Sequence, residues 1–276
     1  MMTFFQRIFH SIAVMAGVAL IFSACGDEPA SGPVAGACFD ASTMDYTREG
    51  PYSFSSRQVD GYTVYVPKAT AGGCNRFPLV GFSLGTAMPA GLYNGYYENF
   101  ASWGITTVVD PANLINLGGG TLEAAILAVQ NHRDFQGKIL STGAVGHSQG
   151  GSAVINVALD DKVRLDAVVG LMPALFQGAG RVQAAGLYIG GTLDQFSVAT
   201  DPGLAYAKTD GPAFIADLNG ATHMLGGVSS EAKGMSTAWL RCHLGKDTNA
   251  CGLFSGSLGK TCLFEGNWAR CEGKNF

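Results

Sequence analysis

Beyond residue 60 the chain alternates between short apolar runs and longer stretches with helical periodicity. The apolar runs show little of the polar alternation of a half-exposed strand, which is typical of strands covered on both faces of a parallel sheet. We expect strands at residues 62–66, 78–83, 105–110, 141–145, 165–172, 186–190 and 212–218. Helical patterns lie between and after them, at residues 90–102, 122–134, 149–159, 203–208 and 230–244. This order predicts one α/β domain with a mostly parallel central sheet and helices on both faces.

The first 24 residues have a different pattern, that of a signal peptide. Arg7 is their only charged residue, and the apolar run at 12–22 is too short to span a bilayer but suits the core of such a peptide. The sequence IFSAC at 21–25 resembles a bacterial lipoprotein signal, in which Cys25 would be lipidated and become the new N-terminus. Residues 25–37 would then form a tether and residues 38–276 the folded domain.

These features predict an exported protein whose partner is a membrane, reached through the N-terminal lipid. We expect an anchor on the outer membrane or cell surface. The alternative is ordinary secretion with cleavage near Cys25, which would leave a periplasmic or secreted protein. The formal net charge of −4 argues against a nucleic-acid partner, which would require a basic surface.

The cysteines agree with export, because disulfides persist in oxidising compartments. Of the seven cysteines, Cys25 is assigned to the lipid and an even number remains. We expect three disulfides, pairing Cys38–Cys74, Cys242–Cys251 and Cys262–Cys271. A zinc site built from the four C-terminal cysteines and His243 is the alternative, but no C-x-x-C knuckle is present. We therefore expect no metal and a C-terminus closed by disulfides.

The strongest chemical motif is Gly-His-Ser-Gln-Gly-Gly at residues 146–151. It follows the expected strand 141–145 and precedes the expected helix 149–159, the context of a G-x-S-x-G nucleophile elbow. The glycines two residues before and after Ser148 permit a strained turn that projects its hydroxyl. We identify Ser148 as the candidate nucleophile.

A serine nucleophile needs a base and an orienting carboxylate, which follow it in the order acid then histidine in this kind of fold. His223 and His243 are the histidines downstream of Ser148, and His223 lies in a small-residue loop directly after the expected strand 212–218. Asp194 follows the expected strand 186–190, whereas the other aspartates between Ser148 and His223 lie at helix or strand boundaries. We therefore expect Asp194 and His223 to complete a catalytic triad.

An oxyanion hole would combine the amide after the nucleophile with one from the loop after an early strand. Gln149 supplies the first amide. Residues 82–87 form the second loop, in which Gly85 permits an unusual backbone angle and Thr86 is the expected donor.

The segments 78–110, GHSQGG, GTLD and ATH resemble bacterial secreted α/β-hydrolases of the polyester-hydrolase, cutinase and lipase group, with chlorophyllase- and dienelactone-hydrolase-like relatives. The likeness covers about residues 78–244. It implies an α/β-hydrolase fold and an acyl pocket near Leu84, and places Leu175 or Phe176 near the group's substrate-stacking Trp. Thr86 stands where an aromatic residue is usual and Gln149 where Met is frequent. These departures weaken the expectation of activity on aromatic polyesters.

Together these observations predict a serine carboxylic-ester hydrolase, similar to esterases, lipases and cutinases, that needs no cofactor and acts as a monomer. Its substrate would be a small-molecule or polymeric ester. The short intervals between the triad residues leave little room for a lid domain, so we expect an open site. Two alternatives remain: an amidase or peptidase with the same triad, and a catalytically silent surface binding protein.

Overall fold

The computed structural model describes residues 45–68, 75–112, 118–160, 162–174, 180–196, 201–224, 228–255 and 267–276. All of them belong to Pro33–Phe276, the second of the two units into which the chain divides. The predicted signal peptide, the tether and Cys25 lie outside the described residues. Within the described part we find no helix with the length and apolarity that a bilayer span requires.

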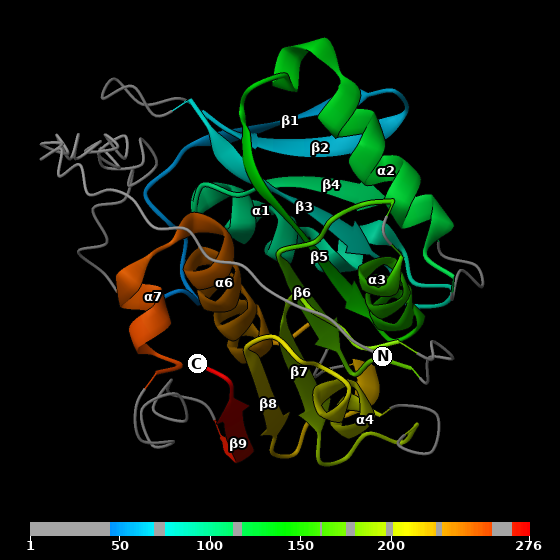
Figure 1. The fold of residues 1–276 in the computed structure, drawn as a ribbon, viewed down its shortest axis with the longest axis vertical. Coiled ribbons are helices and arrows are strands. Elements are labelled where there is room, and N and C mark those ends of the chain that lie inside the picture. The colour runs from blue at the N-terminus through cyan, green and yellow to red at the C-terminus, as the bar shows by residue number, and fades with distance from the viewer. Residues whose placement is uncertain are drawn as a thin grey trace, which may run out of the picture. The chain divides into compact units, whose positions relative to one another are not determined.

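The described strands form one nine-stranded sheet in the order β1-β2-β4-β3-β5-β6-β7-β8-β9 (Figure 1). β1 (Phe54–Val59) and β2 (Tyr62–Pro67) form an antiparallel edge, and β9 (Trp268–Lys274) is antiparallel to β8 at the other edge. The strands between are parallel: β3 (Phe77–Ser83), β4 (Thr106–Asp110), β5 (Ile139–His147), β6 (Ala167–Leu171), β7 (Ala185–Gly191) and β8 (Ala213–Leu218). The prediction of an α/β class with a mostly parallel sheet is confirmed.

Helices pack on both faces of the sheet and form two hydrophobic clusters with it. One cluster contains residues of α1 (Asn94–Ser102) and α6 (Ser230–Gly245), and the short 3-10 helix η1 (Ala90–Tyr93) leads into α1. The other contains residues of α2 (Gly120–Asn131), α3 (Gln149–Leu159) and α4 (Pro202–Ala207), with η2 (Arg133–Phe135) following α2. In Figure 1, α6 lies on the opposite side of the sheet from α2 and α3. Successive β3 residues divide between the clusters, Leu79 to one and Val80 to the other, as strand alternation requires.

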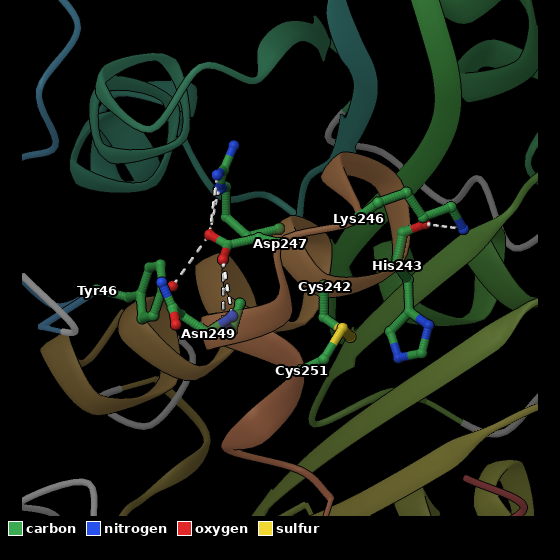
Figure 2. Close-up of a disulfide and its surroundings, with 9 residues drawn as sticks. Tyr46, Cys242, His243, Lys246, Asp247, Asn249 and Cys251 are labelled. Carbon is green, nitrogen blue, oxygen red and sulfur yellow. Dashed lines mark hydrogen bonds and ion pairs between the residues drawn. A yellow bond between two sulfur atoms is a disulfide. The ribbon is translucent and has the colours of Figure 1, made fainter. Parts of the chain in front are cut away.

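The C-terminal part is held by a buried ion pair and a disulfide (Figure 2). Cys242 of α6 is bonded to Cys251 of α7 (Thr248–Gly252), which confirms that predicted pair. Between them Asp247 caps α7 and accepts hydrogen bonds from the buried Arg241 at 2.8 Å and from the hydroxyl of Tyr46 at 3.2 Å. Cys271 is also in a disulfide, but Cys38, Cys74 and Cys262 lie outside the described residues, so the other two predicted pairs stay predictions.

Candidate active site

The parallel strands deliver the predicted site residues to one edge of the sheet. β5 ends at His147, directly before Ser148, while Asp194 follows β7 and His223 follows β8. Thr86 follows β3, which is paired with β5. Because carboxyl ends of parallel strands share an edge, residues distant in the sequence meet there.

Ser148 lies in the strained turn that the glycines predict. Its φ of 56° and ψ of −120° belong to a sparsely populated region, which costs a residue with a side chain about 1–3 kcal/mol. A Cβ on Gly146 would come within 2.1 Å of the Gly150 carbonyl oxygen, and one on Gly150 within 2.3 Å of the Ser83 carbonyl oxygen. Both positions therefore require glycine, and the fold tolerates a strained serine between them.

His223 and Asp194 form a buried pair. The Nδ1 atom of His223 lies 3.0 Å from Oδ2 of Asp194, and their side chains are only 6% and 5% exposed. The other carboxylate oxygen of Asp194 accepts the backbone N–H of Phe196 at 2.7 Å. Because a carboxylate oxygen accepts, this contact places the His223 proton on Nδ1 and leaves Nε2 as the ring's acceptor. That is the form in which an imidazole acts as a base.

One pocket of about 300 Å³ brings Ser148 and His223 together. Thr86 and Gly85 line it as well, which places the predicted oxyanion loop beside the candidate nucleophile. Within the described ranges neither the Ser148 hydroxyl nor Nε2 of His223 makes a hydrogen bond. The hydrogen bond between a catalytic serine and its histidine base is often long in unliganded enzymes and tightens when the substrate binds.

The other residues predicted for the oxyanion hole and the substrate pocket are not among the described residues that line this pocket. Gln149 opens α3 and is 3% exposed, so its amide is among the first N–H groups of that helix. Leu84 is 1% exposed and belongs to the hydrophobic core rather than to the described lining of the pocket. Leu175 and Phe176 lie outside the described residues.

No protein-family model matches the chain, and a search of the curated proteins found no match. Among the described residues, no group of three or more His, Cys, Asp or Glu side chains is arranged to hold a metal ion.

The pocket also contains residues that the sequence patterns did not single out. Phe196 is 50% exposed, and its ring lies edge-on to that of His223 with centroids 5.0 Å apart. Met88, Ala174 and Met224 add further apolar walls. Phe196 stands two residues after Asp194, and Met88 directly follows the predicted loop 82–87, so slightly longer loops would have included both.

His147, in the variable position of the elbow, is a second histidine at the site. It is 1% exposed, and its ring centroid lies 4.9 Å from that of His223. Burial lowers the pKa of His147 to about 4, and the positive charge that His223 can carry acts in the same direction. His147 is therefore a neutral imidazole near pH 7.

Proposed function

We propose that this protein is a serine carboxylic-ester hydrolase with an α/β-hydrolase fold. The observation that carries the proposal is the shared pocket of Ser148, on its strained turn, and His223, whose Nδ1 is held by Asp194. Packing alone requires neither a strained serine nor a buried carboxylate beside a histidine, since each costs folding free energy. A catalytic triad requires both features: the strained serine and the buried pair of carboxylate and histidine.

In the proposed reaction the Ser148 hydroxyl attacks the ester carbonyl carbon while its proton passes to Nε2 of His223. Asp194 stabilises the resulting imidazolium, and the amides of Thr86 and Gln149 stabilise the oxyanion. The carbon–oxygen bond then breaks, and His223 returns the proton to the leaving alcohol. Water attacks the acyl group on Ser148 in the same way, which releases the acid and restores the hydroxyl.

The walls of the pocket favour an apolar group next to the ester. Met88, Ala174, Phe196 and Met224 present carbon and sulfur atoms around a volume of about 300 Å³. Pockets that are mostly apolar, with few polar groups at the reacting atoms, orient small apolar ligands. We therefore expect simple acyl esters to be substrates.

The test is hydrolysis of p-nitrophenyl esters, from acetyl to palmitoyl, by the wild type, Ser148→Ala and Ser56→Ala. Ser56 is an exposed serine on β1 and serves as the matched control. We expect S148A to lose about 10⁴-fold or more in kcat/KM, since the nucleophile is removed, and S56A to match the wild type. Retention of more than a few per cent by S148A would contradict the proposal. Faster cleavage of the matching p-nitroanilides would favour an amidase.

We also propose that the protein is exported and anchored through a lipid on Cys25. The Cys242–Cys251 disulfide supports an oxidising compartment, because cytosolic thiols are kept reduced. An enzyme held at a surface by a tether suits ester substrates that are large or insoluble.

A further inference from the structure

A chain of buried hydrogen bonds joins the loop after β3 to the loop after β8 through His147. The hydroxyl of Tyr93 lies 2.6 Å from Nδ1 of His147, and Nε2 of His147 lies 3.1 Å from the backbone carbonyl oxygen of His223. At the other end the N–H of Gly85 donates to the Tyr93 hydroxyl at a longer 3.4 Å. These contacts span residues 85 to 223, so no local pattern predicts them.

The direction of each hydrogen bond follows from the chemistry of the groups. A carbonyl oxygen only accepts, so Nε2 of His147 donates to His223. The imidazole is neutral, because burial lowers its pKa to about 4, and Nδ1 therefore accepts the proton of the Tyr93 hydroxyl. Burial raises the pKa of Tyr93 to about 12, so that hydroxyl keeps its proton. Its oxygen remains free to accept from Gly85.

The His223 end of this chain completes the support of the candidate base. The N–H of His223 donates to Oε1 of Gln195 at 3.2 Å, and its Nδ1 is held by Asp194 at 3.0 Å. The bond from His147 holds the carbonyl on the other side of the same residue. Backbone and side chain of His223 are thus fixed by three separate partners.

The Gly85 end fixes the loop that carries the candidate oxyanion donor. A Cβ on Gly85 would lie 2.9 Å from Nδ1 of His147 and 3.1 Å from the Tyr93 hydroxyl oxygen. Glycine therefore allows this loop to approach the imidazole closely. Thr86 is the next residue, so the position of its amide depends on this approach.

We propose that His147 is a positioning residue: its neutral Nε2–H form, set by the His223 carbonyl and bonded to Tyr93 through Nδ1, holds the loop of His223 in a fixed position relative to the loop of Thr86. The inference rests on the proposed function. His147 is bonded covalently to Ser148, so one residue relates the nucleophile, the base and the oxyanion donor to each other. An apolar residue of similar size would leave the buried Tyr93 hydroxyl and the His223 carbonyl without these partners.

The variant that tests this directly is Tyr93→Phe, because Tyr93 is not among the described residues that line the pocket. Tyr96→Phe is the matched control. Tyr96 is a buried tyrosine of α1 whose hydroxyl has no hydrogen-bond partner in the described part of the chain. We expect Y93F to lower kcat for a p-nitrophenyl ester by about 10- to 100-fold, as small misplacements of reacting groups do, with KM unchanged. Y96F should retain the wild-type kcat and KM.

A spectroscopic measurement reports the form of His147 without reference to turnover. In ¹⁵N NMR of the wild-type imidazoles, the resonances missing from His147→Gln identify His147. We expect a neutral ring protonated at Nε2 in the wild type and in Y96F. In Y93F the His223 carbonyl still requires the proton on Nε2, so we expect the same neutral form with a shifted Nδ1 resonance, because the donor to Nδ1 is lost.

The outcomes separate the two proposals. A wild type without hydrolytic turnover overturns the proposed function and this inference with it. An active wild type with Y93F equal to Y96F overturns the inference alone, and so does a wild-type His147 protonated at Nδ1. If Y93F fails to fold, the wild-type spectrum still decides.

Discussion

Two buried aspartates of this chain have different partners and different roles. Asp194 faces the imidazole of His223, whereas Asp247 faces Arg241, a guanidinium that is fully buried and stays charged. Arg241 also donates to the carbonyl oxygen of Trp103 at 3.3 Å. Asp247 therefore belongs to the frame of the domain, and removing its charge isolates a buried cation.

At this residue we predict a large loss of stability for Asp247→Asn. Asparagine still caps α7, because its side-chain oxygen accepts from the amides of Asn249 and Ala250. The charge of Arg241 is left uncompensated, which costs about 3–5 kcal/mol. Urea unfolding at neutral pH measures the difference. Asp210→Asn is the control, since its ion pair with Arg181 is exposed and its loss should leave little measurable change. Equal stabilities of the two variants would contradict this role.

The same pair sets a pH dependence of stability. Burial alone would raise the pKa of Asp247. The charge and hydrogen bond of Arg241, together with the hydrogen bonds from Ala250 and Tyr46, outweigh burial, so the pKa lies below its ordinary value of 3.8. A carboxyl with a lowered folded-state pKa stabilises the fold above its unfolded pKa and loses that contribution as the pH falls through the folded one. D247N lacks the carboxyl, so its stability should fall less than that of the wild type below a pH of about 4.

At the scale of elements, the buried strands are the part that the sequence predicts well. Each expected strand from residue 62 to 218 is present within two residues of its predicted bounds, because strands covered on both faces read as apolar runs. β1 and β9 were not predicted. They are edge strands whose side chains are mostly exposed or half-buried, so their sequences FSSRQV and WARCEGK show no apolar run.

The candidate site also contains residues that the sequence predicts and residues that it does not. Ser148, Asp194 and His223 follow from strand ends and motif spacing, and the structure brings Ser148 and His223 into one pocket. Tyr93 could not be predicted from strand ends or motif spacing, because its proposed role depends on a contact with the side chain of His147, 54 positions away. Contacts of that kind arise from packing between elements, which a linear pattern does not encode.

At the junction of α6 and α7 we predict that the Cys242–Cys251 disulfide stabilises the fold by about 2–3 kcal/mol, on the chain-entropy relation for a short loop. The double variant Cys242→Ala/Cys251→Ala should show this loss in urea unfolding, with hydrolytic activity retained under native conditions. Peptide mapping of exported wild-type protein without reductant provides the control. Free thiols at Cys242 and Cys251 in that material would contradict the prediction.

At the scale of the whole molecule, the proposed anchor predicts where the protein is found. Cys25 with a diacylglycerol thioether and an N-acyl chain should carry the acidic domain into the membrane fraction, since two or more acyl chains give stable anchoring where one does not. Cys25→Ser should remove the modification, with the catalytic residues unchanged. Intact mass spectrometry of the mature protein measures it. An unmodified N-terminus downstream of Cys25 would contradict the anchor and indicate a freely secreted enzyme.

The proposed function makes Ser148 a nucleophile activated by His223 and Asp194. Its most direct test is reaction of the wild-type protein with a fluorophosphonate, followed by peptide mapping of the adduct. We predict a single phosphonyl group on Ser148, none in Ser148→Ala, and much slower labelling in His223→Ala, because the base that takes the serine proton is lost. Absence of any adduct on the folded wild type, or an adduct on a residue other than Ser148, would contradict this role of Ser148.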